Sequence, residues 1–194
     1  MNLCLYGASS ENINEIYKTE VEKLGSLMAQ RGHALIFGGG ASGLMGAAAR
    51  GVFSENGKII GVSPSFFNID GILFENCTDL IYTETMRERK QVMEDMSDGF
   101  VVLPGGIGTY EEFFEILTSK QLGLHGKAIS IFNINGYFDE MLVFLEKAIS
   151  EGFMKPACRE LFKVFDSAED VVLYMETYHE EKHEIGEYKF FNKK

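Results

Sequence analysis

The sequence predicts a doubly wound α/β fold, in which a parallel sheet carries helices on both of its faces. Two observations indicate this class. Short apolar runs alternate with stretches in which apolar residues recur at helical spacing, and the alternation covers nearly the whole chain. The apolar runs are also continuous, as in strands that are buried on both faces. Parallel strands joined by crossover helices have both properties, because the helices cover the sheet on either side.

The first half of the chain supplies two strand-helix units and a third strand. An apolar run ends at Tyr6 and passes into the small residues Gly7 to Ser10, after which helical periodicity continues to Met28. The same order then returns, and a turn at Asn56-Gly57 separates the second helix from the next strand. We expect strands at 2–6, 34–37 and 59–62, and helices at about 13–28 and 42–55.

The second half continues the alternation and then departs from it. We expect strands at 80–82, 100–103, 128–132 and 163–165, and helices at about 84–96, 109–121, 137–149 and 168–178. Residues 179–194 are rich in charge and break the pattern. The sequence therefore predicts one domain over residues 1–178 and a C-terminal tail over 179–194, either frayed or packed as an arm.

Composition narrows the class of partner. The 194 residues are 45% hydrophobic, which is enough for one full core without disulfides or a structural metal. The net charge of -11 repels nucleic acid and anionic membranes, so we expect neither as a partner. No run approaches the roughly 20 apolar residues of a spanning helix, and we expect a cytoplasmic protein. Cys4, Cys77 and Cys158 are far apart and lack metal-site spacing, which predicts free thiols.

A glycine-rich loop follows the second predicted strand. Gly38–Gly43 fits the GxGxxG dinucleotide fingerprint, but the next strand ends in Gly61 to Pro64 without the expected acidic residue. Three interpretations stay open. The loop binds NAD, or its glycines let the following helix pack closely on the sheet, or exposed amides such as those of Gly39 and Gly43 bind part of a nucleotide.

A second glycine-rich loop follows the strand at 100–103 and reads Pro-Gly-Gly-Ile-Gly-Thr-Tyr-Glu-Glu over residues 104–112. Three glycines leave the backbone amides of the turn open, and the positive end of a helix lies beside them, which favours an anion site. Thr109 and Glu112 also have the spacing of a capping box. The two interpretations compete, because a glutamate that reaches back to the cap cannot also face a substrate.

Three cations lie close together at the start of the helix expected at 84–96. Arg87, Arg89 and Lys90 oppose the helix dipole, which favours acidic side chains at this end. Either neighbouring glutamates compensate for them on a solvated face, or a bound anion does.

The last two motifs resemble the Lonely Guy (LOG) family, cytokinin riboside 5′-monophosphate phosphoribohydrolases that were formerly labelled lysine decarboxylases. The family signature PGGxGTxxE is met at 104–112, and the Arg-Lys pair that precedes it is met by Arg89 and Lys90. The similarity also includes the GGGxxGLMG stretch at 38–46 and extends to about Tyr178. It implies a Rossmann-like homodimer, or a larger assembly, that uses no metal or cofactor. The implied reaction cleaves the N-glycosidic bond of adenine-type nucleoside 5′-monophosphates, with or without an N6 prenyl group, into free base and ribose 5-phosphate.

The resemblance also implies roles for particular residues. Arg89 and Glu112 are expected to be catalytic. The nucleotide is expected to lie against Lys90, Gly106, Ile107, Gly108, Thr109, Tyr110, Glu111 and Thr118. One position departs from the family: some relatives place an acidic substrate ligand seven residues after the proline corresponding to Pro64, where this chain has Gly71 with Asp70 beside it. Selection of the base is the property that this departure affects.

The chemistry of ribosyl cleavage also suits these residue types, although other functions remain open. Cleavage of a ribosyl bond builds positive charge on the sugar, which a carboxylate such as that of Glu112 can stabilise, or the carboxylate can activate the attacking water. The alternatives are a non-catalytic carrier of a nucleotide or of molybdenum cofactor, and an NAD-dependent dehydrogenase. Lysine decarboxylation is set aside, because it normally requires a pyridoxal phosphate Schiff base.

Overall fold

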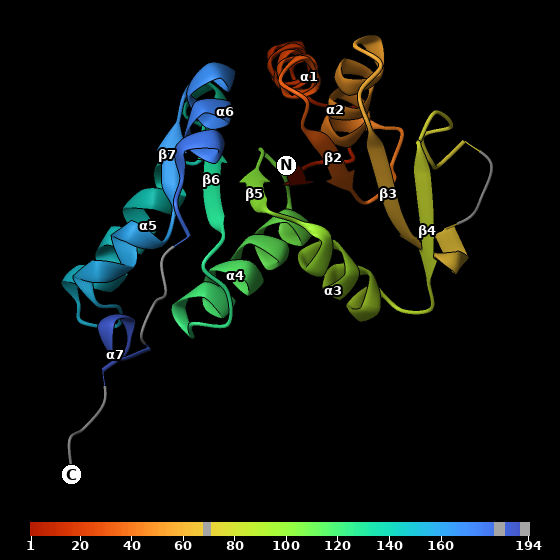
Figure 1. Ribbon diagram of the computed structural model, residues 1–194. Helices are drawn as coiled ribbons and strands as arrows, with labels where there is room; N and C mark the ends of the chain where they lie inside the picture. Colours follow the sequence, from red (N-terminus) through yellow and green to blue (C-terminus); the bar gives the residue numbers. More distant parts are fainter. Residues whose placement is uncertain (68–70, 181–184, 191–194) are drawn as a thin grey trace.

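One parallel sheet organises the chain. The computed structural model describes residues 1–67, 71–180 and 185–190, and within them seven strands pair in the order β4-β3-β2-β1-β5-β6-β7 (Figure 1). The strands are β1 (Asn2–Tyr6), β2 (Ala34–Phe37), β3 (Ile59–Pro64), β4 (Asp79–Thr83), β5 (Gly99–Val102), β6 (Ala128–Phe132) and β7 (Lys163–Phe165). Every pairing is parallel, so the predicted sheet type is confirmed.

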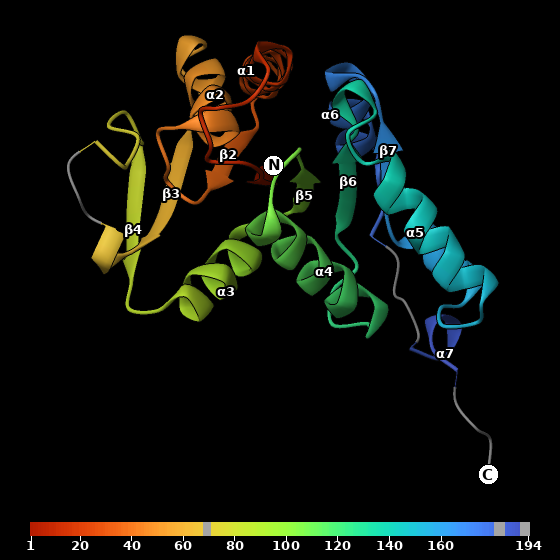
Figure 2. The same ribbon diagram turned by 180° about the vertical axis from the view of Figure 1, so that it is seen from behind.

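Helices cover the sheet on both faces, as Figures 1 and 2 show. One layer holds α1 (Glu15–Gln30), α2 (Gly43–Ser54) and α6 (Ala168–Thr177), and the other holds α3 (Met86–Met96), α4 (Ile107–Gln121) and α5 (Asp139–Ser150). Shorter helices are η1 (Ser65–Phe67), η2 (Ile134–Gly136), η3 (Pro156–Leu161) and α7 (Ile185–Tyr188). The expected strands and helices are all present, with ends shifted by no more than two residues.

Strand residues alternate between the two layers of the core. In β1, Leu3 and Leu5 pack toward α1, α2 and α6, whereas Cys4 and Tyr6 pack toward α3, α4 and α5. All four side chains are buried, because helices lie on both sides of the strand. The continuous apolar runs in the sequence follow directly from this double burial.

Glycines allow α1 and α2 to approach each other closely. A Cβ built on Gly25 would lie 2.3 Å from the carbonyl oxygen of Ala48, and one built on Gly51 would lie 2.0 Å from that of Glu22. Both obstacles are backbone atoms, which cannot swing aside. The glycines therefore set the distance between the two helices.

Replacing Gly51 by alanine is expected to destabilise the protein by about 1–3 kcal/mol, because the helices must separate to admit the methyl group. Urea denaturation measures the change in the free energy of unfolding. Gly108→Ala is the matched control, since Gly108 is also helical and a Cβ there meets no atom within 4 Å. Equal stability of the two variants would contradict this account of the helix contact.

The sheet order places a topological switch point beside β1. The chain passes from β1 to β2 on one side, whereas β5 pairs with β1 on the other. Loops that follow β1 and β5 therefore part toward opposite faces, and ligands of doubly wound sheets bind in the crevice between such loops. Both the loop at 7–10 and the glycine-rich loop at 104–106 lie at this edge.

Part of the C-terminal tail packs on the domain. Gln121 Nε2 at the end of α4 donates to the carbonyl oxygen of Tyr188 at 3.4 Å, and Lys155 Nζ donates to that of Gly186 at 2.7 Å. The described segment 185–190 thus behaves as a packing arm, whereas residues 181–184 and 191–194 lie outside the described residues. The domain boundary at Tyr178 stays a prediction. None of the helices in the described ranges has the length and apolarity needed to cross a membrane.

Candidate active site

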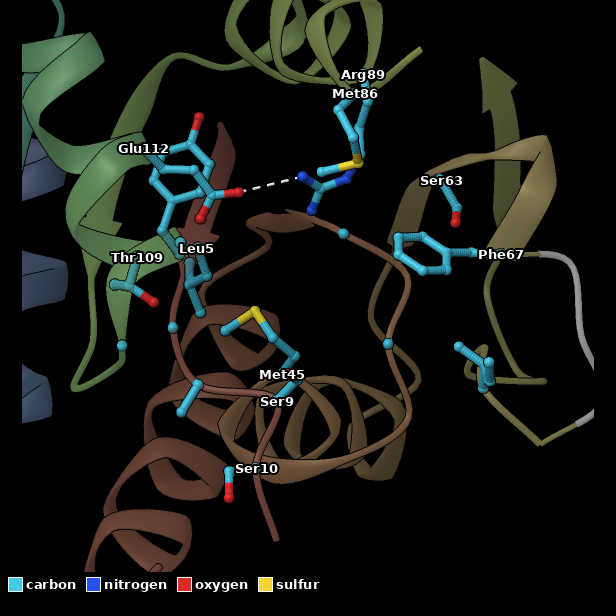
Figure 3. Close-up of a pocket in the computed structure, with 18 of the residues that line it drawn as sticks. Leu5, Ser9, Ser10, Met45, Ser63, Phe67, Met86, Arg89, Thr109 and Glu112 are labelled. Atoms are coloured by element: carbon cyan, nitrogen blue, oxygen red, sulfur yellow. Dashed lines mark hydrogen bonds and ion pairs between the residues drawn. The ribbon is translucent and has the colours of Figure 1, made fainter. Parts of the chain in front are cut away.

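A cavity of about 540 Å³ lies at the carboxyl edge of the sheet, at the switch point. Its walls come from the loops after β1, β2, β3 and β5 and from the first turns of α3 and α4. Figure 3 shows Arg89 and Glu112 joined by a dashed line, with Thr109 on the Glu112 side of the cavity and Phe67 on the opposite side. Two stretches that the sequence singled out, at 86–90 and 104–112, therefore meet in one place.

The centre of the site is an ion pair between α3 and α4. Arg89 Nη1 lies 3.1 Å from Glu112 Oε1, and the side chains are 12% and 13% exposed. Arg89 Nε also donates to the carbonyl oxygen of Val62 at 3.1 Å, at the end of β3. The guanidinium is thus fixed from two directions, and it orients the carboxylate at the edge of the cavity.

Burial and charge act in opposite directions on Glu112. Loss of solvent raises the pKa of its carboxyl above the ordinary value, while the nearby Arg89 guanidinium partly offsets this by favouring the ionised form. A carboxyl with a raised pKa is suited to exchange protons near neutral pH. Tyr6, which also lines the cavity, has its pKa raised well above 10 by burial, so its hydroxyl keeps its proton.

The capping-box interpretation of Thr109 and Glu112 is wrong. Helix α4 begins two residues earlier than expected, at Ile107, and its N-cap is Gly106, which has no side chain to cap it. Thr109 is therefore the third residue of the helix and is buried. Glu112 consequently does not turn back to the helix start but points to Arg89.

A capping threonine and glutamate occur instead at the start of α3. Thr85 Oγ1 accepts the Glu88 amide at 3.1 Å, and Glu88 Oε2 accepts the Glu84 amide at 2.9 Å. The Glu88 carboxylate places a negative charge at this helix start, which offsets part of the positive charge of the first turn. Among the cations, Arg89 pairs with Glu112, and Lys90 pairs with Glu111 and Glu115.

Free backbone donors distinguish the first turn of α4. Within the described part of the chain, no protein acceptor meets the amides of Ile107, Gly108 and Thr109. These three N–H groups are free to donate to a group that lies before the helix start. The positive end of the helix dipole lies at the same place. The turn can therefore accept an anion, and Gly106, Gly108 and Thr109 line the cavity.

The first turn of α2 has no such capacity. The amide of Gly43 donates to Glu11 Oε1 at 2.7 Å, and that of Leu44 donates to the carbonyl oxygen of Ala8 at 2.8 Å. A carboxylate of the protein itself occupies the position where a dinucleotide phosphate would bind. The donors of this turn are therefore already used within the protein, which argues against the NAD interpretation of the fingerprint.

The structure brings together only some of the expected site residues. Arg89, Gly106, Gly108, Thr109 and Glu112 line the cavity. Several others lie beside it without lining it, namely Lys90, Ile107, Tyr110, Glu111, Gly39 and Gly43. Thr118 is exposed on α4 and lines a separate hollow against Phe153 and Phe190.

The cavity also has lining residues that are not among the site residues expected from the sequence. Ser9 and Ser10 follow β1 at the switch point, Ser63 lies near the end of β3, and Phe67 follows that strand. Met86 comes from the first turn of α3. Their position after a predicted strand or at a helix start was the available signal, but nothing in these residue types separates them from ordinary loop positions. Asp70 lies outside the described residues.

Comparison with known proteins agrees with the family resemblance that the sequence motifs indicated. A family described as possible lysine decarboxylase matches residues 45–175. A rice (Oryza sativa subsp. japonica) protein named probable cytokinin riboside 5′-monophosphate phosphoribohydrolase LOGL5 is 35% identical over 91% of this chain and 72% of its own length. The Arabidopsis thaliana cytokinin riboside 5′-monophosphate phosphoribohydrolase LOG1 is 36% identical over 91% of this chain and 83% of its own.

Solved structures share the fold at lower sequence identity. The molybdenum cofactor binding protein of Rippkaea orientalis matches with a TM-score of 0.70 and 19% identity, covering 91% of this chain and 95% of that one. The molybdenum cofactor carrier protein of Chlamydomonas reinhardtii matches with a TM-score of 0.69 and 21% identity, covering 90% and 95%. At such identities the likeness concerns the arrangement of the sheet and helices alone.

Proposed function

Because the chain belongs to the LOG family of cytokinin riboside 5′-monophosphate phosphoribohydrolases, we propose that it hydrolyses the N-glycosidic bond of adenine-type nucleoside 5′-monophosphates to free base and ribose 5-phosphate. One observation carries the proposal beyond the family likeness. A largely buried Arg89–Glu112 pair faces the same cavity as a helix start with unused backbone donors. An anion site and a carboxylate are the two groups that this reaction needs side by side.

The 5′-phosphate binds at the first turn of α4. Amides of Ile107, Gly108 and Thr109 supply charge-assisted hydrogen bonds, each contributing roughly 1.5–3 kcal/mol. Glu112 lies three residues beyond Thr109, about 4.5 Å along the helix at 1.5 Å per residue. This offset matches the separation between a phosphate and the ribose to which it is attached.

Glu112 acts on the water that attacks the anomeric carbon. As the bond from C1′ to the base nitrogen breaks, its electron pair leaves with the base and positive charge builds on the ribose. The carboxylate stabilises this charge and accepts a proton from the water as its oxygen bonds to C1′, while the departing base nitrogen takes a proton from solvent. Glu112 then returns its proton to solvent, which restores the carboxylate. Arg89 holds the carboxylate ionised and oriented during this step, through the 3.1 Å contact.

The base lies toward the apolar side of the cavity. Phe67, Ile72 and Met86 line this side and are partly exposed. Their apolar surface is suited to the flat face of adenine and to an N6 prenyl group, since burial of apolar area contributes about 25 cal/mol per Å². Both AMP and N6-prenyl-AMP are therefore proposed substrates.

Two other functions fit less well. Among the described residues that line the cavity there is no lysine, which a pyridoxal phosphate decarboxylase requires for its Schiff base. The carrier proteins that share the fold are 19% and 21% identical to this chain, against 35% and 36% for the two hydrolases. The hydrolase assignment is therefore preferred.

A homodimer is proposed from the outer surface of α4. Ile107 is 88% exposed, and Phe114 and Thr118 follow at seven and eleven residues, on the same face of the helix. A second copy packed on this face would bury the apolar side chains of Ile107 and Phe114. It would also contact Thr118, which does not line the active-site cavity of its own chain. Sedimentation velocity tests this, and a monomer at micromolar concentration would contradict it.

The cysteines are all free, which agrees with the cytoplasmic location we propose.

Activity is expected to fall at acidic pH as Glu112 takes up a proton. Burial raises the pKa of this carboxyl, so the acidic limb of kcat against pH has its midpoint above the ordinary carboxyl value of 4.5. Initial rates of base release, measured across pH 4–9, give the midpoint. A rate that stays constant down to pH 4 would contradict the assignment of Glu112 as the base.

Base release tests the proposed function as a whole. Purified protein is incubated with AMP or N6-isopentenyl-AMP, and free base, nucleoside and inorganic phosphate are followed by chromatography. We expect base and ribose 5-phosphate in equal amounts. Nucleoside and inorganic phosphate would instead indicate a phosphatase, and no product from folded protein would indicate a binding protein.

A further inference from the structure

The Arg89 guanidinium lies directly over Gly38, at the end of β2. A Cβ built on Gly38 would be 2.0 Å from Arg89 Nη2 and 3.1 Å from Cζ, far inside van der Waals contact. The backbone at Gly38 does not have the positive φ that would require glycine for conformational reasons. What requires glycine here is the space that the guanidinium occupies.

Three neighbours surround the planar head group of Arg89. The Val62 carbonyl oxygen accepts from Nε and the Glu112 carboxylate accepts from Nη1, each at 3.1 Å. The bare Cα of Gly38 borders Nη2. Figure 3 shows the guanidinium held level with the Glu112 carboxylate at the edge of the cavity. If the third side were filled, the head group would have to leave the plane in which it reaches Glu112.

We propose that Gly38 is a positioning residue for hydrolysis. Its missing side chain admits the guanidinium that holds the Glu112 carboxylate ionised and oriented, so the first glycine of the fingerprint-like loop serves an arginine rather than a phosphate. This inference rests on the proposed function, in which Glu112 activates water. It assigns a role to a loop whose helix start is already occupied by Glu11.

Gly40 is a matched comparison in the same loop. It also lines the cavity and has no positive φ, yet a Cβ built there meets no atom within 4 Å. Gly38→Ala and Gly40→Ala therefore add the same methyl group to one loop, and only the first displaces Arg89.

The first experiment compares the two alanine variants as intact, folded protein with AMP. Gly38→Ala is expected to lower kcat by about 10²-fold, the cost of displacing a catalytic group by about 1 Å. The KM for AMP should change less than about threefold, because the α4 amides that bind phosphate are untouched. The midpoint of the acidic limb should rise, since Arg89 no longer lowers the pKa of Glu112, whereas Gly40→Ala should keep it.

A double variant supplies the decisive control. Lysine has no atom at the Nη2 position, so Gly38→Ala should cause little further loss in an Arg89→Lys background. This background also relieves the clash if Gly38→Ala alone folds poorly. Equal fold-losses in both backgrounds, or an unchanged kcat and pH midpoint in Gly38→Ala, would overturn the proposal.

A titration that needs no turnover separates this proposal from the proposed function. Carbon-13 NMR of the Glu112 carboxyl gives its pKa directly in wild type, Gly38→Ala and Gly40→Ala. We expect a higher pKa in Gly38→Ala alone. If wild type releases no base but this shift occurs, the geometric coupling stands and the assigned reaction fails; if base is released but the shift is absent, the role of Gly38 fails.

Discussion

Replacing Glu112 by glutamine is expected to lower kcat for base release by about 10²- to 10⁴-fold, the usual contribution of a positioned general base. The glutamine oxygen can still accept from Arg89 Nη1, so the geometry of the pair is kept while the ability to take a proton is lost. Binding of AMP should remain, because the α4 amides are unaffected. Single-turnover kinetics and equilibrium binding measure the two effects separately.

The loss should occur without loss of stability. Because burial raises the pKa of Glu112, the folded protein binds this proton more tightly than the unfolded chain does. Wild-type stability therefore decreases as pH rises from the ordinary value toward the raised one. The glutamine variant lacks this decrease and should be at least as stable at neutral pH, which thermal unfolding at several pH values measures.

Glu115→Gln is the matched control for this prediction. Glu115 lies on the same helix and pairs with Lys90 at 2.7 Å, outside the cavity. Its variant should retain most of the activity. A Glu112→Gln enzyme with kcat within threefold of wild type would remove the carboxylate from the mechanism.

Removal of the 5′-phosphate from the substrate is expected to have an effect of similar size. Adenosine should be hydrolysed with a kcat/KM at least about 10²-fold lower than that of AMP, because two lost charge-assisted bonds already amount to about 3 kcal/mol. Engagement of all three free amides would raise the factor to about 10³ or more.

Ile107→Pro tests which donors bind the phosphate. Proline is well tolerated at the first helical position, and it removes one of the three amide donors. The preceding Gly106 already has the extended backbone that a residue before proline prefers. We expect a higher KM for AMP and little change for adenosine, whereas Ile107→Ala, which keeps the amide, should resemble wild type. Equal rates on AMP and adenosine in the wild type would place the phosphate elsewhere.

The fold was predictable because its signal is distributed over many residues. The inner strands β1, β2, β3, β5 and β6 are apolar runs buried almost along their whole length, which is typical of a parallel sheet covered on both faces. The edge strands β4 and β7 are partly exposed, and they were predictable from their place in the alternation with helices. The strand order was not predictable, since it depends on which crossovers pass over which face. The switch point beside β1 therefore became visible only in three dimensions.

The site was predictable where residue chemistry is distinctive and failed where spacing alone had to decide. Arg89 and Glu112 were identified and do meet. The Thr-x-x-Glu spacing at Thr109 was ambiguous, because the same pattern suits a cap or the interior of a first turn. The true cap of α3, Thr85 with Glu88, has the same spacing, and only the helix starts distinguish the two.

The other features of the site could not be predicted, because they depend on close approaches between atoms. Gly38 makes room for Arg89, and Glu11 occupies the α2 start, yet both facts depend on contacts between distant parts of the chain. A local glycine pattern cannot reveal whether its amides are free. The contrast between the occupied turn of α2 and the open turn of α4 is what locates the phosphate in this account.

A crystal structure of the Glu112→Gln variant with AMP tests that location most directly. We expect the phosphate on the amides of Ile107, Gly108 and Thr109, and C1′ within reach of the residue 112 side chain through one water molecule. A phosphate bound at the start of α2, or an anomeric carbon separated from residue 112 by the width of the cavity, would contradict it.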